Sequence, residues 1–339
     1  SLYLLAQLRP HWDKPGAQWF VATIVTQSHT GYARASLASL REHADEEVCL
    51  HVLVVDGDPP DDPAGGDPPG YRRHSMRELR GDPVFDAIVD SYAAADLDAL
   101  RWALKPVFLE HLVARDSMEA VAFVDPDQYF VGDPAVLFDF PPGTRLRLSP
   151  HWRPIDPDAG NVFHEQFRDG IFNGGLVVAR EDAVDILSWW ASVCAHRCEK
   201  SPEEGLYVDQ RYLDVVPTYF DGVDVIRHKG VNVARWNRLH LERRTDGRGR
   251  IRVEGDPLVC VHFSESTIRL IERGEDPALE PVLRRYRAAL REQGVELSVP
   301  ERPRGDRREP RFVPNALVRG FRRVRRILGA VRDAVRDAR

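Results

Sequence analysis

The sequence contains few of the residues that cross-link a small protein. It has four cysteines among 339 residues, at Cys49, Cys194, Cys198 and Cys260, too few and too scattered for a disulfide framework. Cys194 and Cys198 lie four residues apart in an expected helix, where two small buried side chains are more common than a metal pair. No further Cys or His pair completes a zinc site at the usual spacing. We therefore expect the fold to be held by a hydrophobic core, in a reducing compartment.

Strong net charge and long apolar runs are also missing. The formal net charge of −6 gives no argument for nucleic acid as a partner. No run of about 18 apolar residues occurs, so we expect no membrane-spanning helix. The segment Ser1–Leu8 is short and lacks the basic flank of a signal peptide. These features favour a cytoplasmic protein, or one on the inner face of the membrane.

Short apolar runs alternate with amphipathic segments, which is typical of an α/β fold. Apolar, β-branched runs predict buried strands, and we expect them at Trp19–Thr26, Val48–Val55, Ala120–Val124, 175–179, 223–227 and 258–263. Helical spacing is found in the segments 32–43, 97–115, 183–196 and 277–293. The polar segment Pro150–Asp169 is interpreted as a long loop. Strand–helix–strand units of this kind predict a mixed, mainly parallel sheet flanked by helices.

Two carboxylates stand directly after the third predicted strand, in Asp125-Pro126-Asp127. Ligands of open parallel sheets bind beyond the carboxyl ends of the strands. Two carboxylates one residue apart can present oxygens to one Mg²⁺ or Mn²⁺, which is often shared with substrate phosphates. The same tripeptide at Asp156-Pro157-Asp158 has no strand before it and predicts a turn. At 125–127, this context alone leaves a metal site and an ordinary turn equally open.

Lysine is scarce, which draws attention to the few lysines that occur. Of 47 basic residues, four are lysines, and one of them, Lys105, lies in a predicted helix beside Leu104 and Pro106. A lysine there is either an ordinary surface charge or a compact cation directed at a phosphate. The residues alone leave both interpretations open.

Seven short segments between Trp19 and Ser266 follow one another in an order that is specific when they are taken together. They are Val25-Thr26 with Tyr32-Ala33, Lys105-Pro106, Val124 to Asp127, Phe172 to Gly175, Val208 to Gln210, Asn232 to Asn237, and Val261 to Ser264. This order resembles bacterial GT-A-fold glycosyltransferases with a D-x-D motif, similar in layout to glycogenin and the lipopolysaccharide galactosyltransferases. The resemblance implies a GT-A-like, Rossmann-like catalytic domain over 1–272. A packing helix at 273–300, a linker at 301–311 and a basic helix at 312–339 would follow it.

The resemblance also implies a metal site. Asp125 and Asp127 would hold Mn²⁺ or Mg²⁺ on the diphosphate of a nucleotide-sugar donor, and His262 would complete the metal shell. From the residues alone, a single histidine in an apolar strand is more often structural. The family usually has glycine after the His-Phe-Ser segment, whereas this chain has Glu265. The loop that closes over the diphosphate is therefore expected to differ.

Further positions of this chain match segments that bind donor and acceptor in the resembled family. The resemblance implies base and ribose contacts at Thr26 and Tyr32, phosphate contacts at Arg101 and Lys105, contacts to the sugars at Asn173, Gly174 and Gly175, catalytic positions at Asn173, Asp209 and Gln210, and an acceptor wall at Asn232, Trp236 and Asn237. Without the resemblance, Asn173-Gly174 is an ordinary turn, Asp209 a helix cap and Trp236 a core residue. UDP is the commonest carrier in the family. The layout favours retention of the anomeric configuration, and we can assign no carboxylate base for inversion.

The segment 312–339 has the pattern of a basic amphipathic helix. Apolar residues recur every three or four positions at Val313, Leu317, Phe321, Val324, Leu328, Val331 and Val335, with arginines between them. Such a helix lies on an anionic membrane as a peripheral contact, or packs on protein. The acceptor stays open among a glycan, a lipid-linked molecule and a small molecule. The tail has few aromatic residues for stacking on bases, which argues against nucleic acid.

Two other classes of protein compete with a glycosyltransferase. A nucleotidyltransferase, or another metal-dependent enzyme that handles phosphates, would usually carry a glycine-rich phosphate loop, and neither common form of that motif occurs. A catalytically inactive module that binds a nucleotide or a sugar would keep the sheet but not the acidic pair and the histidine. The sequence therefore favours the transferase over both.

Overall fold

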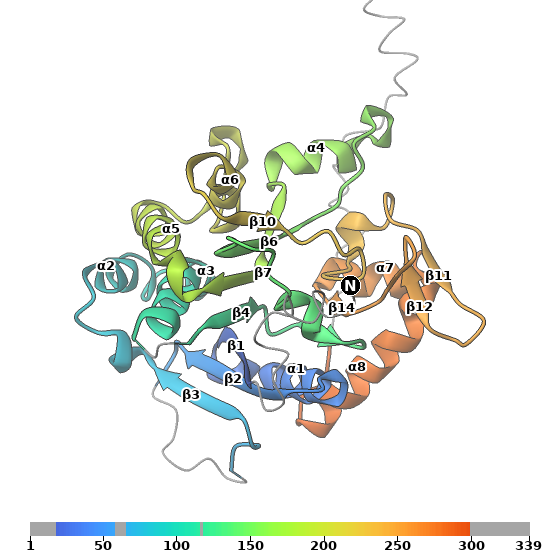
Figure 1. Ribbon diagram of the computed structural model, residues 1–339, viewed down its shortest axis with the longest axis horizontal. Helices are drawn as coiled ribbons and strands as arrows, with labels where there is room; N and C mark the ends of the chain where they lie inside the picture. Colours follow the sequence, from blue (N-terminus) through green and yellow to red (C-terminus); the bar gives the residue numbers. More distant parts are fainter. Residues whose placement is uncertain (1–17, 58–65, 116–117, 299–339) are drawn as a thin grey trace, which may run out of the picture.

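A computed structural model of the chain describes residues 18–57, 66–115 and 118–298. Its centre is a seven-stranded sheet with the strand order β10-β6-β7-β4-β1-β2-β3 (Figure 1). Four neighbouring strands are parallel, namely β4 (Ala120–Val124), β1 (Gln18–Val25), β2 (Glu47–Val54) and β3 (Tyr71–Ser75). The carboxyl ends of these strands therefore meet at one edge of the sheet.

The other half of the sheet contains its antiparallel pairs. Strand β7 (Phe172–Arg180) is antiparallel to β4 and to β6 (Leu146–Pro150), and β10 (Val223–Val225) is parallel to β6. The register between β6 and β7 shifts between Leu148 and Pro150. The predicted mixed, mainly parallel α/β sheet flanked by helices is confirmed.

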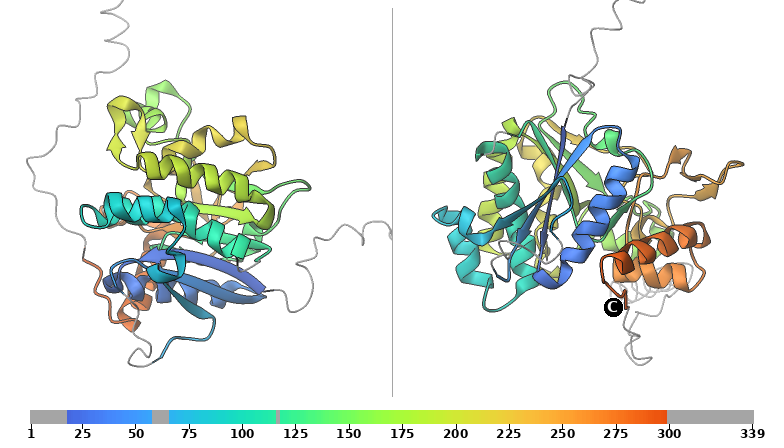
Figure 2. Two further views of the ribbon diagram at one scale, coloured as in Figure 1. Left: turned by 90° about the vertical axis from the view of Figure 1, so that its left-hand side faces the viewer. Right: turned by 90° about the horizontal axis from the view of Figure 1, so that it is seen from below.

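Helices cover both faces of the sheet because successive strand residues point to opposite sides. On β1, Ala22 and Ile24 belong to the core formed with α2 (Pro83–Tyr92), α3 (Leu97–Glu110) and α5 (Val184–His196). Figure 2 shows these helices side by side on that face. On the other face, Val21 and Val25 pack with α1 (Thr30–His43).

A two-stranded ladder next to the main sheet is braced by the last described helices. Strand β5 (Gln128–Phe130) pairs antiparallel with β14 (Cys260–His262). Helices α7 (Glu265–Glu272) and α8 (Glu280–Glu292) pack behind it. The buried Tyr286 of α8 stacks on Phe263 with ring centroids 4.4 Å apart, and its ring lies 5.4 Å from that of Tyr129. Helix α8 thus supports both strands of the ladder.

Shorter elements connect these parts. The remaining ones are η3 (Gln27–His29), η4 (Met76–Leu79), the π-helical turn η5 (His111–Arg115), η6 (Pro134–Leu137), η7 (Pro157–Ala159), α4 (Asn161–Arg168), η8 (Glu181–Ala183), β8 (Lys200–Ser201), η9 (Pro202–Glu204), β9 (Leu206–Tyr207), η10 (Gln210–Asp214), α6 (Val216–Tyr219), η11 (Arg235–Asn237), β11 (Arg243–Thr245), β12 (Ile251–Val253), β13 (Asp256–Pro257) and η12 (Pro277–Leu279). Within the described ranges, no helix is both long and apolar enough to cross a membrane.

The structure differs from the sequence-based prediction in two respects. The expected loop Pro150–Asp169 contains α4, whose apolar side chains Phe163 and Phe167 contact each other on one face. Strand β3 and helix α2 were not predicted. The predicted linker 301–311 and basic helix 312–339 lie outside the described residues.

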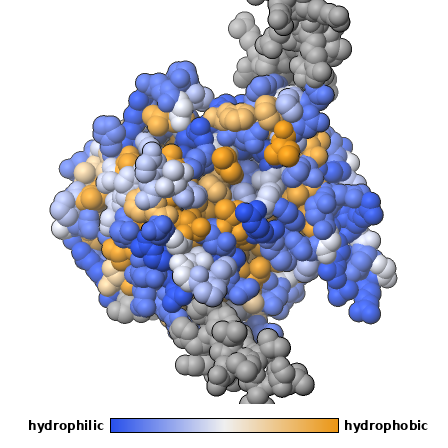
Figure 3. All heavy atoms as spheres, turned by 45° about the horizontal axis from the view of Figure 1, so that its top comes forward, coloured by the Kyte–Doolittle hydropathy of each residue, from blue (hydrophilic) through white to orange (hydrophobic). Residues whose placement is uncertain are grey.

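Polar side chains cover most of the face shown in Figure 3, and apolar ones gather in separate patches. Exposed large apolar residues include Ile155, Phe167 and Ile171, all on the segment between β6 and β7.

Candidate active site

The acidic pair lies where β4 ends and the chain turns into β5. The turn is held by the backbone, because the Asp125 amide donates to Gly175 O at 2.8 Å and the Gln128 amide donates to Asp125 O at 3.0 Å. The side chains of Asp125 and Asp127 remain 24% and 30% exposed. The second Asp-Pro-Asp is the turn that was predicted, since Asp156 caps the short helix η7. Only the first copy directly follows a strand of the sheet.

His262 joins the acidic pair through the β5–β14 ladder, in which it is the partner of Gln128. Its Nε2 atom lies 3.2 Å from Asp127 Oδ1 and 3.9 Å from Asp125 Oδ2. One potential ligand atom from each of the three residues lies within 4.8 Å of the others. Two carboxylates and one imidazole form a donor set that suits Mn²⁺ or Mg²⁺ bound together with a phosphate. The residues present therefore fit the predicted metal.

The other ring nitrogen of His262, Nδ1, contacts the buried side chain of Asn232. This Nδ1 atom lies 3.2 Å from Asn232 Oδ1. The Asn232 amide nitrogen donates to Ser149 Oγ at 3.0 Å and to Asn173 Oδ1 at 3.1 Å, which fixes the amide with its oxygen toward His262. Nδ1–H therefore donates to Asn232, and Nε2 faces the aspartates. This is the arrangement that usually orients a metal-binding histidine.

The histidine and the nearer aspartate also influence each other's charge. Burial opposes protonation of His262, but the Asp127 carboxylate outweighs it and raises the pKa of His262. Burial likewise opposes ionisation of Asp127, yet His262 holds the pKa of Asp127 below its usual value. A cation bound here would take the place of the histidine proton, so metal binding would release protons.

Lys105 is a buried member of the same site. Its Nζ lies 3.2 Å from Asp125 Oδ1 and 3.4 Å from Asp209 Oδ2, and it donates to Gly174 O at 3.1 Å. The side chain is 5% exposed, so the interpretation as an ordinary surface charge is wrong. Burial would lower the pKa of Lys105, but Asp125 and Asp209 raise it. Burial also raises the pKa of Asp209 to about 6, because it outweighs the opposing charge of Lys105.

Glycines let β7 pass close to these carboxylates. A Cβ atom on Gly175 would lie 2.3 Å from Asp125 Oδ2 and 2.8 Å from His262 Cε1. A Cβ atom on Gly174 would lie 2.4 Å from Asp209 Oδ2. The turn interpretation of Asn173-Gly174 is wrong, because both residues belong to β7, in the stretch where its register with β6 shifts.

Asn173 connects the metal side of the site to Gln210. Its oxygen accepts from the Gly175 amide at 3.0 Å, and its Nδ2 lies 3.2 Å from His151 Nε2 and 3.4 Å from Gln210 Oε1. Burial lowers the pKa of His151 well below its usual value, so this ring is neutral and accepts from Asn173. Gln210 is held in turn by a 2.7 Å bond from its amide to Asp169 O.

Unusual backbone conformations occur around the same network. Among the described residues, four non-glycine residues have positive φ, and three of them are Trp152 (50°), Val208 (46°) and Asn232 (55°). Val208 precedes Asp209, and Asn232 binds His262. Conformations of this kind are costly for residues other than glycine, and they tend to gather at functional sites.

A pocket of about 320 Å³ opens in front of the acidic pair. Its lining includes Tyr32, Arg101, Lys105, Asp125 and Asp127, all predicted from the sequence, together with Ile24, His29, Trp102, Phe123, Pro126, Phe263, Glu265, Ile268, Leu297 and Ser298. The rings of His29 and Tyr32 stack with centroids 5.3 Å apart. The pocket therefore combines cations, carboxylates and an aromatic wall.

Other predicted binding residues lie behind this surface. Asn232 and Asn237 have no exposed surface, and Asn237 binds Asn232 O and the Ala234 amide. The Oγ1 atom of Thr26 lies 2.7 Å from Nδ1 of His29. Trp236 packs its ring edge-on against His262 at 5.0 Å. These residues support the site from behind. They are not among the residues that line the pocket.

Asp209 and Gln210 are also buried, at 1% and 8% exposure. Asp209 stands at the N-cap of η10, but its side chain does not cap and pairs with Lys105 instead. Sequence reasoning missed His29, His151, Leu297 and Ser298. The first two are isolated polar residues without a motif, and the last two reach the pocket only because α8 returns the chain to it.

The fold and the site define an α/β protein with a candidate metal centre at the carboxyl edge of a mainly parallel sheet. The chain belongs to the family of two Bacillus subtilis (strain 168) proteins, YfnF and YfnD, each described as an uncharacterized protein. It is 30% identical to YfnF over 260 residues, which are 71% of this chain and 80% of YfnF. It is 30% identical to YfnD over 267 residues, which are 73% of this chain and 78% of YfnD. No family model matches the sequence.

Solved glycosyltransferases show a more distant likeness. Mouse xyloside xylosyltransferase 1 has a TM-score of 0.47 and 16% identity, covering 74% of this chain and 99% of its own. The galactosyltransferase LgtC, in complex with donor and acceptor sugar analogs, has a TM-score of 0.46 and 15% identity, covering 72% and 86%.

Proposed function

We propose that this protein is a metal-dependent glycosyltransferase that uses a nucleotide-sugar donor. The observation that carries the proposal is the convergence of Asp125, Asp127 and His262 within 4.8 Å beside the 320 Å³ pocket. The order of motifs along the chain, which resembles GT-A-fold glycosyltransferases, supports the same assignment. UDP-sugars are the favoured donors, because UDP is the commonest carrier in that family.

The metal would be held by the two aspartates and His262. A bound Mn²⁺ or Mg²⁺ supplies Lewis-acid stabilisation of the negative charge that develops on a departing diphosphate. The 3.2 Å contact between Asn232 Oδ1 and His262 Nδ1 keeps the Nε2 atom of His262 directed at the aspartates. The protein thereby presents its ligands already oriented, before the donor arrives.

Lys105 and Arg101 add positive charge on the helix that faces the acidic pair. Lys105 is held in place by Asp125, Asp209 and Gly174 O. Arg101 lies one helical turn earlier and pairs with Asp98. We assign both cations to the diphosphate of the donor, and the stacked His29 and Tyr32 to the base and ribose. Aromatic rings offer a nucleobase a stacking surface that needs no particular hydrogen-bond pattern.

We propose transfer with retention of the anomeric configuration. An inverting enzyme needs a carboxylate base that deprotonates the acceptor. Among the described residues that line the pocket, the carboxylate outside the metal pair is Glu265, which is paired with Arg269. Asp209 and Gln210 lie directly behind Gly174 and are assigned to the side of the donor sugar. A product whose anomeric proton in an NMR spectrum has the opposite configuration to the donor would overturn this assignment.

A thermal-shift screen tests the proposed function. UDP, GDP and dTDP are compared with and without Mn²⁺ or Mg²⁺, since a ligand that binds the folded state raises the unfolding temperature by mass action. We expect one nucleotide to stabilise the protein only with the metal, and Asp127→Asn to remove this shift. The matched control is Asp158→Asn, in the second Asp-Pro-Asp, which should behave as the wild type. Binding of a nucleotide without turnover of any nucleotide sugar would instead support an inactive binding module.

A further inference from the structure

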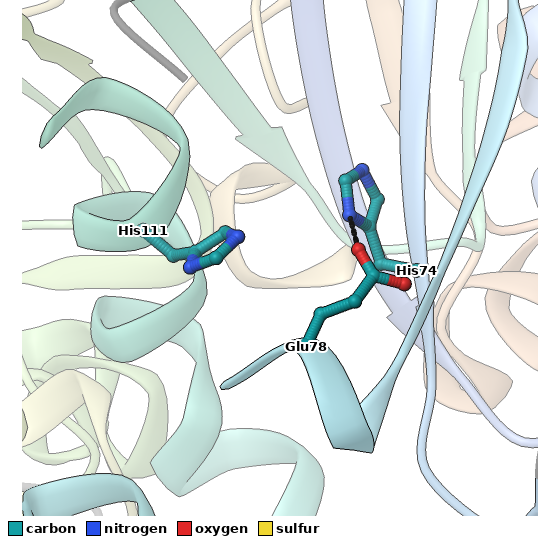
Figure 4. A group of neighbouring side chains, drawn as sticks. All are labelled: His74, Glu78 and His111. Carbon is teal, nitrogen blue, oxygen red and sulfur yellow. Dashed lines mark hydrogen bonds and ion pairs between the residues drawn. The ribbon is translucent and has the colours of Figure 1, made fainter. Parts of the chain in front are cut away.

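A second group of side chains that could hold a metal ion lies at the edge strand of the main sheet, outside the pocket described above. His74 is on β3, Glu78 is on η4, and His111 begins the π-helical turn η5 that continues α3. One potential ligand atom from each residue lies within 4.8 Å of the others. Figure 4 shows the three side chains directed toward one another from separate elements.

The individual contacts identify which atoms face the centre of this group. His74 Nδ1 lies 2.8 Å from Glu78 Oε2. The other oxygen of Glu78, Oε1, accepts from the Ser75 amide at 2.8 Å in a capping box. The cap therefore holds the carboxylate by one oxygen and leaves the second directed at His74 and His111.

The far side of His74 is supported by a buried chain of polar groups. Its Nε2 lies 2.8 Å from His51 Nδ1, and His51 Nε2 lies 3.5 Å from Cys49 Sγ. His51 and His74 are each 1% exposed. A histidine that binds a metal through one ring nitrogen normally donates its other N–H to a hydrogen-bond acceptor. His51 Nδ1 is placed to accept this bond from His74 Nε2.

Two of the three side chains, those of Glu78 and His111, are open to solvent. His111 lines a hollow of about 100 Å³, together with Asp82, Glu110 and Arg115. His111 is partly exposed, and the side chain of Glu78 is 45% exposed. These two ligands can therefore close on an ion while the buried His74 stays in place.

We propose that His74, Glu78 and His111 form a second metal site, which binds Zn²⁺. Two imidazoles and one carboxylate are a ligand set that zinc prefers, and three protein ligands leave a position for water. The site does not depend on the proposed transferase function, since it shares no residue with the acidic pair. It would tie the edge strand β3 to the end of α3, the helix that carries Arg101 and Lys105.

The test is a calorimetric titration of the full-length protein with Zn²⁺. All variants carry Asp127→Asn, which removes the first centre as a competing site. In this background we expect one equivalent of Zn²⁺ to bind. Adding His111→Ala or Glu78→Gln should weaken that binding at least about tenfold. Glu78→Gln keeps the oxygen that caps Ser75, so it changes the ligand without removing the cap. The matched control is His240→Ala, an exposed histidine outside the group, which should bind as the background does.

Three results would overturn the second site. They are no Zn²⁺ binding by the Asp127→Asn protein, equal binding by the His111→Ala and His240→Ala proteins, and equal binding after Glu78→Gln. Circular dichroism of each variant in EDTA shows whether it is folded. If His111→Ala unfolds the protein, Glu78→Gln alone decides the question, because it alters one terminal atom of an exposed side chain.

Discussion

The two candidate metal centres have the same number of ligands and differ in what surrounds them. Asp125, Asp127 and His262 offer two carboxylates and one imidazole to a pocket of about 320 Å³ lined by cations and aromatic rings. His74, Glu78 and His111 offer two imidazoles and one carboxylate, and His111 lines a hollow of about 100 Å³. The first donor set suits an ion shared with phosphates, and the second suits zinc held by three protein ligands and a water molecule. We therefore propose the first centre as a substrate site and the second as a site that supports the fold.

The largest expected effect comes from removing one carboxylate of the first centre. Asp127→Asn should lower metal-dependent consumption of the nucleotide sugar by on the order of 10³-fold, since it removes a ligand of the ion that stabilises the leaving diphosphate. Release of the nucleoside diphosphate measures this rate. Asp158→Asn is the control, and an equal loss in both variants would show that the first Asp-Pro-Asp has no special role.

A smaller effect is expected from adding one methyl group next to Asp125. Gly175→Ala would place its Cβ 2.3 Å from Asp125 Oδ2, so the carboxylate must move away from the metal position. We expect the affinity for Mn²⁺ to fall about 10- to 100-fold, the range seen when the surroundings of a metal ligand are disturbed. Mn²⁺ titration followed by electron paramagnetic resonance measures this affinity. Gly247→Ala, where nothing lies within 4 Å of the new atom, should change nothing.

The two centres should also respond separately to different metals. His111→Ala should leave the Mn²⁺-dependent thermal shift by nucleotide unchanged, because the first centre keeps all its ligands. Asp127→Asn should leave the Zn²⁺-dependent shift in place for the same reason. Thermal unfolding of each variant with each metal gives the four comparisons. Loss of both shifts in either single variant would mean that the two clusters do not act as separate sites.

The last prediction concerns the stability contributed by the buried pair of Lys105 and Asp209. Because burial raises the pKa of Asp209 to about 6, its contribution to stability is complete below its unfolded-state value near 3.8 and is lost as the pH rises through about 6. The change is at most about 1.4 kcal/mol per pH unit in that window. Denaturant unfolding in EDTA from pH 4 to pH 7 should show this slope in the wild type and not in Asp209→Asn. Parallel curves for the two proteins would contradict the shifted pKa.

Much of the fold was predictable because its strands are apolar runs that end in charged turns. Strand β4, which precedes Asp125, and its neighbour β1 were recognised in this way. Strand β3 was missed because its sequence, Tyr-Arg-Arg-His-Ser, is mostly polar, as an edge strand permits. Helix α4 was missed because its residues are polar on average and its apolar stripe is short.

The candidate site was predictable where a motif carried it. Asp125 and Asp127 were named from their position after an apolar strand, and His262 was named from the resemblance. The ladder between β5 and β14 brings the three residues together. The burial of Asp209 and Asn237 could not be predicted, because it depends on contacts between segments far apart in the chain. The His74 group was also invisible in the sequence, since its residues show no metal-binding spacing and meet only through the packing of β3 against α3.

Calorimetric titration of the wild-type protein with the preferred nucleoside diphosphate, with and without Mn²⁺, tests the central claim most directly. The account predicts binding of one nucleotide per chain that requires Mn²⁺ and disappears in Asp127→Asn. Nucleotide binding of equal strength in EDTA, or in the Asp127→Asn protein with Mn²⁺, would contradict a metal centre formed by Asp125, Asp127 and His262.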